Sequence, residues 1–124
     1  LKMKTNLLNE DFEEAKKLID NLDSKYDITC VFWYLDVTAW RLFITIKNHN
    51  KQTDNKIKAD ITNNISELGI NGFSDSDCVP CQENALTQGL KSMFFFPPKK
   101  YIYSTFENTT INNIRINKLI LMRM

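Results

Sequence analysis

The stretch "DITCVFWYLDVTAWRLFITI", residues 27–46, predicts the centre of the fold. Two runs rich in β-branched and aromatic side chains flank "LDVTA", a pattern typical of a β-hairpin. The first run is apolar on nearly both faces, which indicates a strand in the middle of a sheet. In the second run, large apolar residues alternate with a mixed set, so we expect one buried face. The apolar set is Trp40, Leu42, Ile44 and Ile46.

Amphipathic helices are predicted on both sides of this hairpin. Upstream, apolar residues recur every three or four positions with acids and lysines opposite, and Asn9 is the expected N-cap. This stripe consists of Leu8, Phe12, Ala15, Ile19 and Leu22. Downstream, a second stripe predicts a helix that ends at Gly69. It consists of Ile57, Ile61, Ile65 and Leu68.

The last third of the chain predicts a helix followed by two strands. Residues from about Pro80 to Phe94 favour a third helix, with Asp77 or Cys78 at its cap and the proline in its first turn. The following "FFFPPKK" would break this helix. "INGFSDSD", residues 70–77, holds at most a short edge strand. "YIYSTF" and "INNIRINKLILMRM" are predicted strands joined by a turn at "ENTT".

Together these elements predict a single α+β domain over residues 1–124. The expected order is α-β-β-α-(β)-α-β-β, an antiparallel sheet of four to five strands packed against about three helices on one face. No stretch reaches the roughly 20 apolar residues that span a bilayer, so no membrane is expected as a partner. The N-terminal residues lack an apolar signal core, and the number of cysteines is three. These features favour a cytoplasmic protein.

The sequence "SDSDCVPCQEN", residues 74–84, contains the clearest chemical motif. A Cys-x-Pro-Cys motif at the start of a helix can lower a thiol pKa, which makes Cys78 and Cys81 redox candidates. However, the motif follows a polar loop rather than a buried strand, and Asp75 and Asp77 would raise a thiol pKa. Incidental thiols near a helix start are therefore the favoured interpretation.

Metal binding and catalysis have less support. A zinc site would have to recruit Cys30, from an expected core strand, and the one histidine, His49, from a polar loop. No Cys-His arrangement follows from spacing, and a chain with three glycines has no phosphate-binding loop. The sequence gives no positive sign of an enzyme, and we predict no cofactor, no metal and no catalytic residue.

Charge is uneven along the chain although the net charge is +1. Residues 9–27 hold seven acids against three lysines, and from residue 99 onward five cations stand against Glu107 alone. Cations interleaved with tyrosines are typical of single-strand nucleic-acid binding. The candidate binding residues are Lys99, Lys100, Tyr101, Tyr103, Arg115, Lys118 and Arg123. The tyrosines could equally cover the core. The apolar "MFFFPP" is a core plug or a protein contact.

Three stretches resemble a family of small bacterial proteins known mainly as hypothetical open reading frames. They are "EDFEEAKKLIDNL", "VFWYLDVTAWRLFI" and "FENTTINNIRINKLILMR", in that order. Trp33, Asp36, Trp40 and Arg41 match the family pattern, whereas the two cysteines of the 74–84 stretch depart from it. The family has no assigned activity, so the resemblance implies no catalytic residue. We expect a non-enzymatic module that binds a protein partner or itself, with nucleic-acid binding as the alternative.

Overall fold

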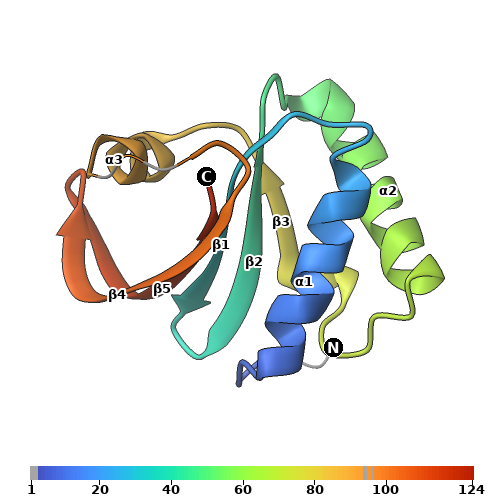
Figure 1. Ribbon diagram of the computed structural model, residues 1–124, viewed down its shortest axis with the longest axis horizontal. Helices are drawn as coiled ribbons and strands as arrows, with labels where there is room; N and C mark the ends of the chain where they lie inside the picture. Colours follow the sequence, from blue (N-terminus) through green and yellow to red (C-terminus); the bar gives the residue numbers. More distant parts are fainter. Residues whose placement is uncertain (1–2, 94, 96) are drawn as a thin grey trace.

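The computed structural model describes residues 3–93, 95 and 97–124 and has the predicted α+β order. Five strands form one sheet in the order β3-β2-β1-β5-β4 (Figure 1). The helices are α1 (Asn9–Leu22), α2 (Lys51–Glu67) and α3 (Ala85–Met93), with a short 3-10 turn at Asp75–Asp77. The strands are β1 (Ile28–Asp36), β2 (Ala39–Ile46), β3 (Cys78–Cys81), β4 (Tyr101–Ile111) and β5 (Ile114–Arg123). The sheet is mixed rather than purely antiparallel, because β3 runs parallel to β2.

The predicted hairpin is confirmed as the centre of the sheet. β1 and β2 pair antiparallel, with Trp33 opposite Leu42, and the turn between them places Val37 at φ 58°. β1 also pairs antiparallel with β5, and its alternate residues enter a separate core cluster on each face of the sheet. This double burial explains why the first run of the hairpin lacks polar alternation.

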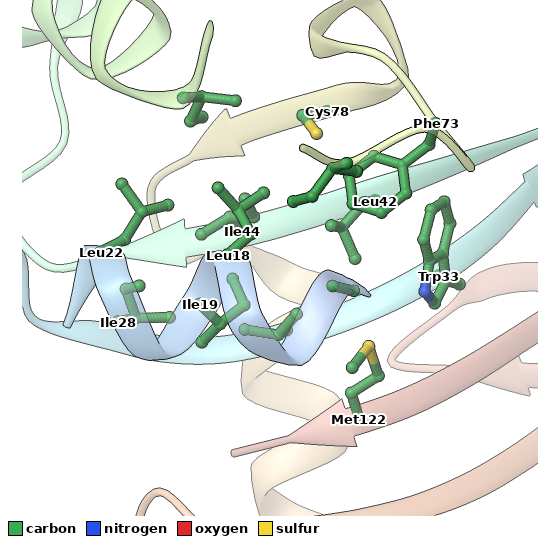
Figure 2. Packing of buried hydrophobic residues seen from close by; sticks show 14 of the residues in the cluster. Leu18, Ile19, Leu22, Ile28, Trp33, Leu42, Ile44, Phe73, Cys78 and Met122 are labelled. Atoms are coloured by element: carbon green, nitrogen blue, oxygen red, sulfur yellow. The ribbon is translucent and has the colours of Figure 1, made fainter. Parts of the chain in front are cut away.

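Helices cover both faces of the sheet, whereas the sequence predicted one. α1 and α2 pack on the face that carries Trp33, Leu42 and Ile44, with Leu18 and Ile19 pointing into this cluster (Figure 2). α3 contributes Leu90 to a second cluster on the opposite face, around Cys30 and Phe32. In Figure 1 the curled β4–β5 hairpin and α3 lie together on the side of the sheet away from α2. Among the described residues, no helix is long and apolar enough to cross a membrane.

The prediction of a helix from about Pro80 is wrong for residues 78–81. They form β3, an edge strand, and α3 begins at Ala85, where the side chain of Asn84 accepts a hydrogen bond from Thr87 N at 3.1 Å. Proline is tolerated both in the first turn of a helix and on a sheet edge, so Pro80 did not distinguish the two. The predicted helix end at Phe94 lies outside the described residues.

The N-terminal part of α1 holds two other segments in place. Leu8 rather than Asn9 is the N-cap, and its backbone N–H donates to Asp11 Oδ2 at 2.7 Å. The same oxygen lies 2.7 Å from Lys4 Nζ, and Asp11 is 1% exposed. Glu14 accepts hydrogen bonds from the backbone N–H groups of Asn71 and Gly72 at 3.0 and 2.8 Å. The first turns of α1 therefore fix both the N-terminal segment and the loop after α2.

The β4–β5 hairpin is long and irregular at its edge. Asn112 and Asn113 make its turn with φ 50° and 65°, a conformation that asparagine tolerates. A bulge interrupts the pairing between Tyr101 and Ser104, and Tyr103 within it has φ 50°. Bulges of this kind twist an edge strand and hinder its pairing with another chain.

Candidate functional site

Tyr101 and Arg123, two of the seven predicted binding residues, form a structural cluster with α1. The guanidinium of Arg123 is 2% exposed and donates from both terminal nitrogens to Asp23 at 2.7 Å. Burial alone would lower the pKa of Arg123, but the hydrogen bonds to Asp23 raise it. Its guanidinium also lies 5.5 Å from the ring centroid of Tyr101, whose hydroxyl donates to Asp20 at 2.9 Å. Both polar groups are therefore already paired with carboxylates at the C-terminal end of α1.

Tyr103 is the more accessible tyrosine. Its ring stacks on Tyr101 at 6.2 Å between centroids and meets the edge of Phe12 at 5.9 Å, and the residue remains 43% exposed. Burial and the nearby carboxylates of Glu13 and Asp20 raise the pKa of Tyr103. Its surroundings are thus an acidic face of α1 rather than a basic groove.

The other four cations are dispersed. Lys118 Nζ lies 3.3 Å from Glu107, and Arg115 donates to the carbonyl of Asn108 at 3.2 Å. Lys99 and Lys100 are exposed in the turn before β4, at the end of the hairpin opposite to Arg115. The structure therefore gathers Tyr101, Tyr103 and Arg123 but does not bring all seven residues onto one open surface.

The two cysteines of the Cys-x-Pro-Cys motif point to opposite faces of β3. Cys78 belongs to the core cluster under α1 and α2 and is 7% exposed. Cys81 pairs with Thr45, which in turn pairs with Cys30 of the α3-side cluster. Three residues along a strand span about 10 Å, beyond the roughly 7 Å between Cα atoms that a disulfide bridges. The motif is thus built neither as a dithiol nor as one half of a metal chelate.

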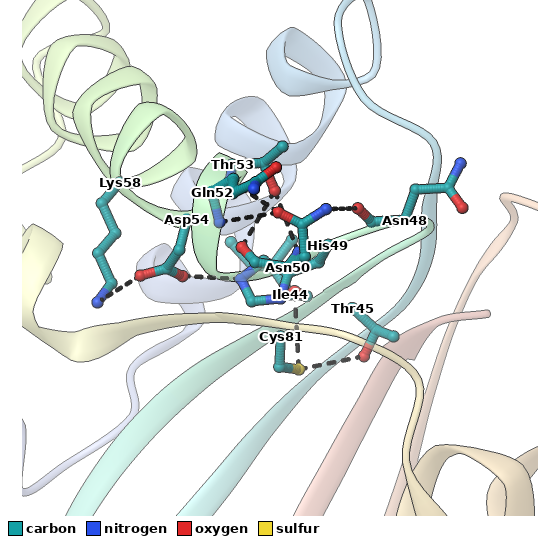
Figure 3. Close-up of polar contacts among 10 residues, drawn as sticks. All are labelled: Ile44, Thr45, Asn48, His49, Asn50, Gln52, Thr53, Asp54, Lys58 and Cys81. Carbon is teal, nitrogen blue, oxygen red and sulfur yellow. Dashed lines mark hydrogen bonds and ion pairs between the residues drawn. The ribbon is translucent and has the colours of Figure 1, made fainter.

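A pocket that the sequence did not predict opens where β3 ends and α2 begins. It has a volume of about 440 Å³, and its lining includes His49, Asp54 and Cys81. Nε2 of His49 lies 2.7 Å from Oδ1 of Asp54, whose other oxygen lies 2.9 Å from Lys58 Nζ (Figure 3). The hydrogen bonds from His49 and then Lys58 lower the pKa of Asp54. The sequence separation of His49 and Cys81 gave no signal for this proximity.

Cys81 is half-buried in that pocket and has two weak polar neighbours. Its Sγ lies 3.6 Å from Thr45 Oγ1 and 3.8 Å from the carbonyl oxygen of Ile44 (Figure 3). Burial raises the pKa of the Cys81 thiol, and the Thr45 hydroxyl partly offsets this effect. Among the described residues, no group of three or more His, Cys, Asp or Glu side chains is arranged to hold a metal.

A second pocket lies beside the predicted "MFFFPP" contact. Its volume is about 350 Å³, and the exposed ring of Phe95 stands at its rim with 96% of the residue accessible. Phe94 and Phe96 lie outside the described residues. The remaining lining residues are Asp27, Ile28, Thr29, Lys91, Pro98, Lys99 and Met124. This arrangement combines an apolar hollow, an unburied aromatic ring and charges of both signs.

Comparison with known proteins gave no family model, no curated protein and no solved structure that matches the chain.

Proposed function

We propose that the protein works by self-association, as a two-fold dimer in which Phe95 of each copy enters the pocket lined by Ile28, Pro98 and Met124 of the other. The observation that supports this proposal is the 96% exposure of Phe95 at the rim of an apolar pocket. Burying a phenylalanine side chain gains about 2–3 kcal/mol, and a two-fold axis makes the contact twice.

Charges at the same rim favour a second copy as the occupant. Asp27 and Lys99 both line the pocket, and neither forms an ion pair within the described part of the chain. In a two-fold arrangement, Asp27 of one copy can face Lys99 of the other at both ends of the contact. An interface limited to this region is small, so we expect weak association, with a dissociation constant of about 10 μM or higher.

Sedimentation velocity over a range of protein concentrations tests the proposal. The wild-type protein should shift from monomer toward dimer as concentration rises, and Phe95→Ser should remain monomeric. Val37→Ser is the matched control, because Val37 is an apolar residue that is 83% exposed in the β1–β2 turn, outside this pocket. A monomeric wild-type protein at every concentration, or unchanged association in Phe95→Ser, would overturn the proposal.

Charge reversal gives a sharper test of the two-fold geometry. Asp27→Lys and Lys99→Glu should each weaken association, because each creates a like-charge contact twice. The double variant should restore it, since the exchanged charges again face each other across the axis. If the double variant fails to recover the wild-type dimer, the contact between Asp27 of one copy and Lys99 of the other is excluded. The Phe95 contact is then judged by Phe95→Ser alone.

Nucleic-acid binding, the alternative expectation, stays a prediction. Within the described chain, Lys99 and Lys100 are the exposed cations of the candidate set that form no ion pair or hydrogen bond through their side chains. Two phosphate contacts would give a slope of about −1.4 for log K against log salt on single strands. Fluorescence anisotropy with a labelled single-stranded DNA measures that slope. Lys100→Glu should abolish such binding without affecting the dimer.

A further inference from the structure

The loop after α2 contains Asn71 and Gly72, the one place in the chain where an asparagine is followed by a glycine. The backbone nitrogen of the residue after an asparagine can attack the side-chain amide carbon, and a glycine presents no side chain that obstructs this approach. Asn71 is exposed and lines a pocket of about 580 Å³, so water reaches it. Within the described chain its side chain forms no hydrogen bond, so no contact of this kind fixes the amide.

Packing against α1 requires a glycine at position 72. A Cβ there would lie 2.1 Å from Oδ1 of Asp11 and 2.6 Å from Oε1 of Glu14. Asp11 is 1% exposed and pairs with Lys4, and Glu14 is hydrogen-bonded to the loop, so neither oxygen can move away freely. The fold therefore keeps beside Asn71 the neighbour that obstructs its reaction least.

The carboxylate of Glu14 restrains the nitrogen that would react. Its Oε1 accepts a hydrogen bond from the Gly72 N–H at 2.8 Å, and its Oε2 accepts one from the Asn71 N–H at 3.0 Å. To attack, the Gly72 nitrogen must lose its proton and turn toward the side chain of Asn71. A hydrogen bond to a carboxylate stabilises the N–H group, and the adjacent negative charge opposes formation of an amide anion. The reaction is therefore slow while α1 holds the loop.

We propose that Asn71 is a site of deamidation and that Glu14 sets its rate, so that the modification records how often the loop after α2 leaves α1. Local openings of exposed loops require less free energy than global unfolding. In the open state the Gly72 N–H has lost its carboxylate acceptor, and the reaction proceeds as in an unstructured chain. The accumulated product therefore reports the time that the loop has spent detached from α1.

The reaction consumes water and releases ammonia, and it needs no oxidant or cofactor. The Gly72 nitrogen gives its proton to hydroxide from solvent and forms a bond to Cγ of Asn71. The bond between Cγ and Nδ2 then breaks, and Nδ2 takes a proton from water and leaves as ammonia. Water opens the resulting cyclic imide at one of its two carbonyl carbons. The product is aspartate at position 71 or its isoaspartyl isomer, in which the backbone runs through the former side chain.

Either product should weaken the attachment of the loop to α1. The pocket beside Asn71 is already lined by the carboxylates of Glu10, Glu13 and Glu14. A further carboxylate at position 71 adds a like charge next to them, which is unfavourable. The isoaspartyl form also lengthens the backbone and shifts the Gly72 N–H away from Glu14. A loop that has reacted while open therefore returns to α1 less readily than the original loop.

Incubation of the native protein in mildly alkaline buffer, followed by peptide mapping with mass spectrometry, tests the site. The mass increase from amide to acid should appear first at Asn71, before Asn112, which is exposed but followed by another asparagine. Glu14→Ala should accelerate conversion of Asn71 by about tenfold or more, because it removes two hydrogen bonds to a charged acceptor. Glu13→Ala is the matched control, since Glu13 lines the same pocket without a hydrogen bond to the loop in the described structure. No conversion of Asn71 in either wild-type protein or Glu14→Ala, or equal conversion of Asn112, would overturn the site.

Two further variants separate the Glu14 contact from a general loss of stability. Asp23→Ala removes an ion pair at the other end of α1 and leaves both hydrogen bonds of Glu14 in place, so its Asn71 should convert at the wild-type rate while the protein stays folded. Acceleration equal to that of Glu14→Ala would overturn the role of Glu14. Asn71→Asp, which has the sequence of the aspartate product, should unfold at a lower urea concentration than the wild-type protein. Asn63→Asp, which adds the same charge at an exposed position of α2, should change the midpoint little, and an equal midpoint for the two variants would overturn the weakened attachment.

Discussion

Removal of the Asp23 carboxylate should destabilise the protein far more than removal of an exposed acid. Asp23 receives both terminal nitrogens of Arg123 at 2.7 Å, and the guanidinium is 2% exposed. Asp23→Ala leaves this cation buried without its partner, a change that typically costs about 3–5 kcal/mol. Because Asp23 itself is 24% exposed, water can reach part of the vacated site, and we expect a loss of about 3 kcal/mol.

Urea unfolding followed by tryptophan fluorescence measures this loss. With a slope of about 1.5 kcal/mol/M, the midpoint should fall by about 2 M. Arg123→Met should cost less, about 1–2 kcal/mol, because the remaining Asp23 can regain solvent. Glu107→Gln is the control, since its pair with Lys118 is exposed and should contribute less than about 0.5 kcal/mol. A midpoint for Asp23→Ala equal to that of the control would refute this account of the buried pair.

Four further predictions concern single positions. Gly72→Ala should cost about 2 kcal/mol or more, because its Cβ would lie 2.1 Å from Oδ1 of Asp11. Gly69→Ala, with open space but φ 65°, should cost only about 1 kcal/mol in the same urea experiment. Val37→Gly should raise stability by about 1 kcal/mol, since a β-branched side chain at φ 58° is relieved, and a lower melting temperature would contradict this. Burial and a hydrogen bond to a carboxylate raise the pKa of Tyr26 from 10.0 to about 12. The native state therefore favours the neutral phenol, so the contribution of Tyr26 to the free energy of unfolding is complete below pH 10 and disappears toward pH 12. Urea midpoints measured across that pH range should show this loss in the wild-type protein and not in Tyr26→Phe.

The elements that the sequence predicted correctly carry their own periodicity. α1, α2 and the central hairpin each bury a face whose residues recur at the helical or strand spacing, so neighbouring positions suffice to identify them. The error at residues 78–81 has a different cause. β3 consists of four residues and pairs parallel with β2, a long-range contact that leaves no local pattern. Cys-x-Pro-Cys satisfies the residue preferences of a helix start and of a sheet edge alike.

The structure does not bring all of the candidate binding residues together, for a related reason. Alternation along β4 and β5 places Tyr101 and Arg123 on one side, but it does not report the acids of α1 that meet them there. Asp20 and Asp23 lie 81 and 100 residues before Tyr101 and Arg123, their respective partners. A cation in a sequence is therefore a weak sign of a free positive charge until its packing partner is known.

Whether Cys78 and Cys81 can act as a dithiol depends on the secondary structure that contains them. In a helix, residues three apart lie on the same face, and a dithiol would be a reasonable interpretation. In a strand, residues three apart point to opposite sides, and each thiol then belongs to a different environment. Cys78 accordingly becomes part of the core, while the sulfur of Cys81 lies beside Thr45 and the carbonyl oxygen of Ile44. The two thiols of this segment therefore cannot act together as a dithiol, because the pairing of β3 with β2 places their sulfur atoms on opposite faces of the strand.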